Sequence, residues 1–196
     1  MKFVERDTAS HRSDEALRRE ADGLLDAGLR DTLASYGEVH IGGSYALRLM
    51  TWRDLDVHVV RDRPDLARCF ALGAAIATRL EPHRMHFRDE RRVATVGLPR
   101  GLYWGVYLGD ERAGAWKIDI WSTDRAGFED VRRHGERLAA RLSEASRHTI
   151  LQIKSACWRH PEYRRAFSSV DIYSAVLDHG VGDVEGFWRF IGRSGA

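Results

Sequence analysis

The residues best suited to chemistry lie in one short segment, 41–60, which reads IGGSYALRLMTWRDLDVHVV. In it, Asp54 and Asp56 are separated by one residue and lead into an apolar run, a pattern that indicates a strand. Alternate residues of a strand share a face, so the two carboxylates should point the same way, about 7 Å apart at ~3.4 Å per residue. Two carboxylates on one face repel unless a cation lies between them, and hard oxygen ligands of this kind suit Mg²⁺. We therefore expect a metal site at Asp54 and Asp56.

A turn of small residues, Gly42, Gly43 and Ser44, precedes the two aspartates. Its backbone can approach a ligand closely, and a helix starting near Ser44 would direct free N–H groups at an anion. Metal-binding carboxylates beside a turn that can hold phosphate indicate a nucleotide-handling site. The simpler interpretation is an ordinary turn followed by an aspartate that caps a strand or helix, because such turn chemistry is common.

A third aspartate, Asp119, lies inside a later apolar segment, 116–121, which reads WKIDIW. It alternates with isoleucines, so the strand should be largely buried, and a buried carboxylate needs a metal, a cation or hydrogen bonds. Lys117 is two residues earlier and should face the same side. It could bind a phosphate oxygen or lower the pKa of the acids; the alternative is a lysine at a strand edge.

Gly43-Ser44, nine intervening residues and then Asp54-Leu55-Asp56 resemble the signature of the DNA polymerase beta-type nucleotidyltransferase superfamily, which also places a third aspartate on a later strand. The resemblance covers roughly residues 39 to 122. It implies an enzyme that uses two Mg²⁺ ions, with an NTP such as ATP as co-substrate. Asp54 and Asp56 would hold both ions. Asp119 would ligate the second ion and accept the proton of an acceptor hydroxyl.

Further residues are expected to contact the nucleotide. The Gly42–Ser44 turn would hold the β- and γ-phosphates, and Arg48, one turn into the following helix, would neutralise developing charge. Lys154 lies on an otherwise apolar helix face. Many relatives carry a helical-domain lysine that meets the triphosphate, and some toxins pair it with a later aspartate, here Asp171. The alternative is a lysine whose stem is buried and whose charged end reaches water.

The acceptor is left open by these residues. Small antibiotic-modifying nucleotidyltransferases have a similar size and a Gly-Gly turn before their Asp-x-Asp, whereas toxin-type relatives modify tRNA ends or proteins. The net charge of +2 is too small to indicate nucleic-acid binding, which favours a small hydroxylated molecule as the partner. A non-catalytic module with this fold, binding a partner, is the remaining alternative. Three repelling acids argue against it, since a binding module has no need of them.

The composition, with 43% hydrophobic and 31% charged residues in 196, is ordinary for a globular enzyme. No apolar stretch approaches the ~18 residues of a membrane span, and the polar N-terminal segment does not resemble a signal peptide. Cys69 and Cys157 are far apart and are interpreted as reduced thiols. We therefore expect a cytoplasmic protein with no membrane partner.

These patterns predict an α+β fold, in which a nucleotidyltransferase-like mixed sheet flanked by helices is followed by a C-terminal helical bundle. The catalytic core would cover residues 1–123 and the helical subdomain residues 124–196. Helices are predicted over 14–36, over 64–80 and from 124 onward. Gly23 and Gly28 suggest a break within the first of these helices. Strands are predicted at 38–41, 55–60, 83–88, 93–98, 103–108 and 115–122, the last two joined as a hairpin.

Overall fold

The computed structural model of the chain describes residues 2–92, 95 and 97–192. A five-stranded sheet lies at its centre, in the order β1-β2-β5-β4-β3. Its strands are β1 (Glu38–Ile41), β2 (Asp54–Val60), β3 (Arg84–Asp89), β4 (Leu102–Tyr107) and β5 (Lys117–Thr123). β2 and β5 run parallel and the other neighbouring pairs are antiparallel, so the sheet is mixed, as predicted.

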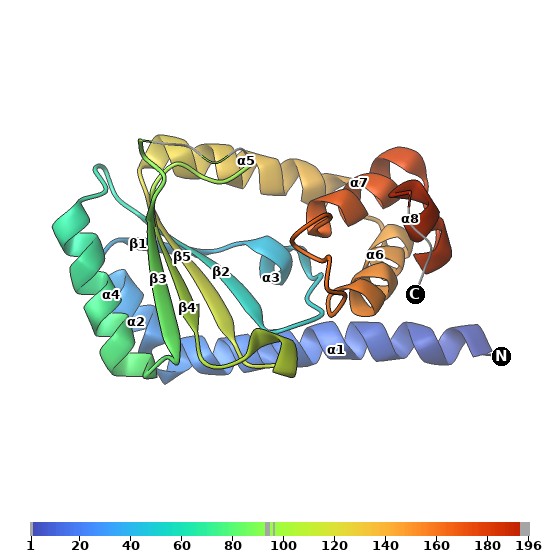
Figure 1. The fold of residues 1–196 in the computed structure, drawn as a ribbon, viewed down its shortest axis with the longest axis horizontal. Coiled ribbons are helices and arrows are strands. Elements are labelled where there is room, and N and C mark those ends of the chain that lie inside the picture. The colour runs from blue at the N-terminus through green and yellow to red at the C-terminus, as the bar shows by residue number, and fades with distance from the viewer. Residues whose placement is uncertain (1, 93–94, 96, 193–196) are drawn as a thin grey trace.

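Helices cover both faces of this sheet (Figure 1). On one side lie α1 (Lys2–Leu24), a π-helical turn (Leu25–Leu29), α2 (Arg30–Ala34) and α4 (Leu66–Leu80). Their apolar side chains form a core with residues that alternate along the two central strands: Leu55, Val57, Val59, Ile118 and Ile120. The short α3 (Gly43–Leu47) joins β1 to β2, and α5 (Arg125–Arg141) lies on the side of the sheet opposite α1. The acidic positions of β2 alternate with this core and so face away from it.

The remaining helices are α6 (Glu144–Cys157), α7 (Ser169–His179) and α8 (Val184–Phe190), which pack around a second hydrophobic cluster. Leu49 and Trp52, from the segment before β2, also belong to this cluster. Helix α1 runs along both parts of the molecule (Figure 1). The division into residues 1–123 and 124–196 stays a prediction. None of the described helices is long and apolar enough to cross a membrane.

The predicted hairpin is present: β4 and β5 pair antiparallel, and their connection contains the 3₁₀ turn Glu111–Ala113. The helix predicted for 14–36 instead begins at Lys2 and ends at Ala34. It is interrupted at the π-helical turn, where Gly28 has a φ of 100°. A left-handed backbone of this kind cannot continue an α-helix, which is why the break falls at Gly28 and not at Gly23.

Half of the strand predicted for 93–98 falls on residues 93, 94 and 96, which lie outside the described residues. Of the others, Thr95, Gly97 and Leu98 are not in a strand. Gly97 has a φ of 83°, a turn conformation that ends any extended run.

Candidate active site

The parallel pairing of β2 with β5 creates the site. It aligns Asp56 with Asp119 and Asp54 with Lys117. Because alternate residues of a strand share a face, all four side chains lie on the face away from the core. The three predicted metal ligands are therefore brought together from two segments that are far apart in the sequence.

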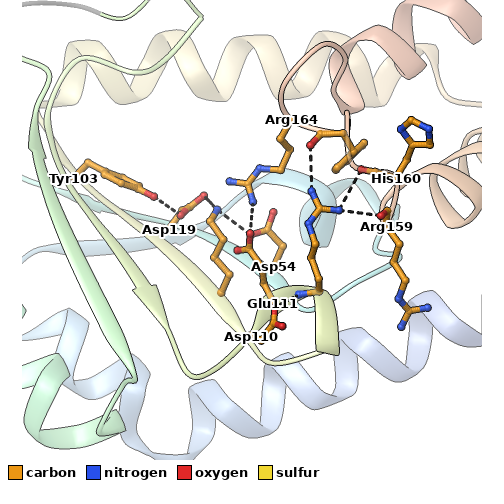
Figure 2. A network of polar contacts seen from close by, with 11 residues as sticks. Asp54, Tyr103, Asp110, Glu111, Asp119, Arg159, His160 and Arg164 are labelled. Carbon is orange, nitrogen blue, oxygen red and sulfur yellow. Dashed lines mark hydrogen bonds and ion pairs between the residues drawn. The ribbon is translucent and has the colours of Figure 1, made fainter. Parts of the chain in front are cut away.

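The ammonium of Lys117 connects two of the three acids. It donates to Oδ1 of Asp54 at 3.3 Å and forms a short ion pair with Oδ2 of Asp119. The other oxygen of Asp119 accepts a hydrogen bond of 2.6 Å from the hydroxyl of Tyr103, on β4 (Figure 2). Lys117 is only 1% exposed, so it is not the lysine at a strand edge that one interpretation of the sequence allowed.

The charges on these groups depend on one another. Burial, followed by the neighbouring charges of Asp54 and Asp119, raises the pKa of Asp56 to about 7. Burial alone would lower the pKa of Lys117, but the charges of Asp54 and Asp119 outweigh burial and raise it above its usual range. Burial and the nearby Asp119 carboxylate also raise the pKa of Tyr103, which keeps its hydroxyl a donor. The site thus combines a charged lysine with acids that are only partly neutralised.

The Gly42–Ser44 turn lies directly against Asp56. The backbone N–H of Gly42 donates to the carbonyl of Asp56 at 2.8 Å. Gly43 has a φ of 57°, and a Cβ atom at this position would lie 1.8 Å from Oδ2 of Asp56. Only glycine leaves this approach open, so the turn and the acids are adjacent, as the spacing predicted.

Two of the predicted nucleotide-binding residues do not contact the aspartates. Helix α3 ends at Leu47, so Arg48 is not one turn inside it but is its left-handed C-cap, with a φ of 56°. The charge of Arg48 acts on Asp14 and Arg147. Because the helix ends before Arg48, its side chain is not held on the face that the sequence predicted.

Lys154 is close to the site but already bonded. Its ammonium donates to the carbonyl of Leu49 at 2.6 Å and to the hydroxyl of Tyr173 at 3.3 Å, and the residue is 1% exposed. The charged end therefore does not reach water. The predicted partner Asp171 instead accepts hydrogen bonds from Ser168 and caps α7. Lys154 is thus bonded, on α7, to Tyr173, which lies two residues after Asp171, and not to Asp171 itself.

Arg164 is a residue of the site that the sequence did not reveal. It lies between α6 and α7, and its guanidinium is placed above Asp54 (Figure 2). It pairs loosely with Glu111 at 3.6 Å and has a φ of 67°, which is unusual for a side chain of this size. The charges of Asp54 and Glu111 raise the pKa of Arg164 against the opposing effect of burial. The segment between α6 and α7 thus places a second cationic side chain near the aspartates of the sheet.

The residues fit a divalent metal by their chemistry. With the side chains as they lie, no group of three or more His, Cys, Asp or Glu within the described ranges could hold a metal ion. Instead, the ammonium of Lys117 lies between Asp54 and Asp119. Asp56 receives no hydrogen bond on its carboxylate from any described residue, and burial together with the charges of Asp54 and Asp119 raises its pKa. Three carboxylates on one face, one of which accepts no hydrogen bond from a described residue, are a suitable set of hard oxygen donors for Mg²⁺.

The chain shares its fold with solved nucleotidyltransferase structures, as predicted. No protein-family model and no curated protein matches the sequence. Solved structures do match. A cytoplasmic RNA terminal U-transferase is 17% identical with a TM-score of 0.59, covering 89% of this chain and 54% of that chain. The Cid1 poly(U) polymerase with Mg and 3′-dATP is 18% identical with a TM-score of 0.61, covering 90% of this chain and 54% of that chain.

A structure of Cid1 in complex with its short product ApU is also similar, with 16% identity, a TM-score of 0.59 and coverage of 90% of this chain and 55% of that chain. At these identities the likeness concerns the fold. The chain spans about half the length of the structures that it matches.

Proposed function

We propose that this protein transfers a nucleoside monophosphate from an NTP to the 3′-terminal hydroxyl of an RNA and releases pyrophosphate. One observation carries the proposal: Asp54, Asp56 and Asp119 converge on one sheet face, directly beside a turn in which only glycine fits at position 43. Three carboxylates this close together are suited to binding divalent ions that also bind a triphosphate.

In this proposal Asp54 and Asp56 hold Mg²⁺, and Asp119 completes the ligand set next to the acceptor. The bound ions supply charge neutralisation for the phosphates and lower the pKa of the acceptor hydroxyl. The Gly42–Ser44 turn holds the β- and γ-phosphates. A bond forms between the acceptor oxygen and the α-phosphorus, the bond to pyrophosphate breaks, and Asp119 accepts the hydroxyl proton. Tyr103 orients Asp119 through its hydrogen bond.

The two basic side chains nearest this chemistry receive separate roles. Arg164 faces the acids from the C-terminal segment and is proposed to neutralise charge on the triphosphate. Lys154 is proposed to shape the nucleotide pocket by holding the carbonyl of Leu49 and the hydroxyl of Tyr173. Arg48, which is exposed at the end of α3, stays a proposed residue for neutralising developing charge, although it does not lie one turn inside the helix.

The choice of acceptor rests on the neighbours. Two of the similar structures are described by their RNA-extending activity, and a third holds the short product ApU. They support the RNA alternative over the small hydroxylated molecule that the net charge of +2 suggested. We also propose a cytoplasmic location, because Cys69 and Cys157 are both free and buried.

The test is a transfer assay with each α-labelled NTP, Mg²⁺ and a short single-stranded oligoribonucleotide or tRNA. The expected product is RNA lengthened at its 3′ end. Two controls should show no product: the same RNA ending in a 3′-deoxynucleotide, and the Asp54→Asn variant, whose neutral amide cannot replace a carboxylate ligand. Polyhydroxylated small molecules form a parallel arm.

Transfer of the label to a small molecule and not to RNA would show that the acceptor is a small hydroxylated molecule, as the net charge suggested. Mg²⁺-dependent NTP binding in calorimetry without transfer to any acceptor would favour the non-catalytic module. Full activity of Asp54→Asn would contradict the assignment of the site.

A further inference from the structure

Lys117 differs from Lys154, which is equally buried, because its ammonium is bonded to acids of the site. Its side chain is 1% exposed, and its ammonium contacts Asp54 and Asp119 together. The sheet register imposes this arrangement, since Lys117 lies opposite Asp54 and two residues before Asp119 on the same face. The contact is therefore fixed by backbone pairing and not by a mobile side chain at the surface.

A buried ammonium is costly unless it is paired, and three carboxylates in one place are costly unless a cation is near. Each group thus compensates the other in the metal-free protein. The oxygens that Lys117 contacts belong to two of the three carboxylates that, in the proposed function, must bind the metal. The third carboxylate, Asp56, is not hydrogen-bonded by Lys117.

We propose that Lys117 is an internal counter-ion that occupies the metal-binding carboxylates and must leave Asp54 and Asp119 before a divalent ion can bind both. Lys117 is then a positioning residue that sets the metal affinity of the site. It holds the acids together when the metal is absent and weakens the binding of the metal in return. The inference rests on the proposed function, because it takes the three aspartates as the metal site.

The competition has a defined energetic direction. Removing the ammonium takes away a partner of the acids in the metal-free state but takes nothing from the metal-bound state, in which Lys117 is already displaced. A variant without this charge should therefore be less stable without metal and should bind metal more tightly. A purely structural lysine would affect stability and leave metal affinity unchanged.

The test compares Lys117→Met with the matched control Lys154→Met. Lys154 is equally buried, but it bonds to the carbonyl of Leu49 and the hydroxyl of Tyr173 and acts on Asp54 and Asp56 only through space. Both variants should unfold at a lower temperature in EDTA. A calorimetric titration with Mn²⁺ in the absence of nucleotide should show that Lys117→Met binds Mn²⁺ at least ~10-fold more tightly than wild type. Lys154→Met should tighten Mn²⁺ binding clearly less, by no more than about threefold, because it removes a charge that acts on the acids only through space.

Lys117→Arg keeps the positive charge and covers the case in which Lys117→Met does not fold without metal. It should bind Mn²⁺ no more tightly than wild type. Lys117→Met that needs Mn²⁺ in order to refold would support the proposal, provided that Lys154→Met does not.

Two results would overturn the inference, and they differ in what else they overturn. If wild type binds Mn²⁺ and folded Lys117→Met binds it equally or less tightly, Lys117 does not compete with the metal and the proposed function stands. If neither protein binds Mn²⁺ and Asp54→Asn melts as wild type does with and without the ion, the aspartates are not a metal site and both proposals are wrong.

Discussion

Asp56 carries a pH-sensitive charge of the site. Burial and the charges of Asp54 and Asp119 raise its pKa from the ordinary value of 3.8 to about 7. At intermediate pH the folded protein keeps this proton while the unfolded chain has lost it. The raised pKa therefore lowers the stability of the metal-free protein as pH rises from near 3.8 to about 7, and the full penalty is present above that range.

Asp56→Asn should remove this penalty because the amide carries no charge. In EDTA at pH 8 the variant should exceed wild type in free energy of unfolding by several kcal/mol, up to ~4 kcal/mol for a pKa raised from 3.8 to about 7. The difference should shrink toward pH 4, and Mg²⁺ should stabilise wild type only. Chemical denaturation at the two pH values measures both effects, with Asp62→Asn on an exposed loop as control. An equal gain at both pH values would show that ionisation of Asp56 is not the cause.

Gly43 tests whether the turn must lie against the acids. Gly43→Ala would place a methyl group 1.8 Å from Oδ2 of Asp56, at a φ of 57°. Gly180 has a similar φ of 68° and open space around an added Cβ, so Gly180→Ala carries the backbone strain without the collision. Each variant should lose about 1–2 kcal/mol of stability from strain.

Gly43→Ala alone should displace Asp56 and so lose Mg²⁺-dependent NTP binding and transfer. Denaturation curves and NTP titrations of both variants decide the matter. Wild-type NTP binding by folded Gly43→Ala would mean that the phosphates are held elsewhere.

At the scale of the elements, the sequence shows which residues share a face but not which strands are neighbours. Asp54 and Asp56 could be placed on one face because alternation is a local property of a strand. The alignment of Asp56 with Asp119 depends on pairing between distant segments, which core packing sets. For the same reason the hydrogen bond from Tyr103 could not be predicted. Arg164 has no local signature at all, being one of 28 arginines and lying in a loop.

The first helix illustrates the same limit. Two glycines suggested a break, and local sequence could not distinguish them. Gly23 is in regular helix with nothing within 4 Å of an added Cβ, whereas Gly28 has a φ of 100°. The backbone at Gly28 is bent where the chain passes from α1 into α2 along the sheet core, which is a tertiary requirement.

The two glycines should respond oppositely to alanine. Gly23→Ala should stabilise the protein by about 0.5–1 kcal/mol, because alanine loses less backbone entropy in a helix. Gly28→Ala should destabilise it by ~1–2 kcal/mol through left-handed strain. The nearest atoms to its new Cβ are at the flexible end of Arg79, which can move aside. Urea denaturation of both variants is the measurement, and equal signs would refute the assignment of the break.

At the scale of the whole molecule, the site lies where two hydrophobic clusters meet. One cluster fills the sheet and its helices, and the other fills the C-terminal helices. Polar contacts connect the two across the site. Lys154 on α6 holds the carbonyl of Leu49, and Arg112 in the β4–β5 connection donates to the carbonyls of Arg159 and His160 at 3.0 and 3.1 Å. The segment that Arg112 holds also carries Arg164, so the contact positions a cation over the acids.

Arg112→Ala should loosen this segment without unfolding the protein. Its guanidinium is exposed, and the freed carbonyls of Arg159 and His160 can bond to water, so global stability should fall by less than about 1 kcal/mol. Hydrogen exchange should rise across residues 159–167, and NTP binding should weaken as Arg164 loses its fixed position. Arg132→Ala, on α5, removes ion pairs to Glu129 and Glu136 far from the segment and is the control.

The control should leave exchange in 159–167 and NTP affinity as in wild type, since exposed ion pairs within one helix contribute little. Exchange that rises evenly over the whole chain in Arg112→Ala would mean that Arg112 supports the fold in general. Unchanged exchange in 159–167 would mean that the packing of Tyr163 and Phe167 into the C-terminal cluster holds the segment by itself. Increased exchange with unchanged NTP binding would show that Arg164 takes no part in holding the triphosphate.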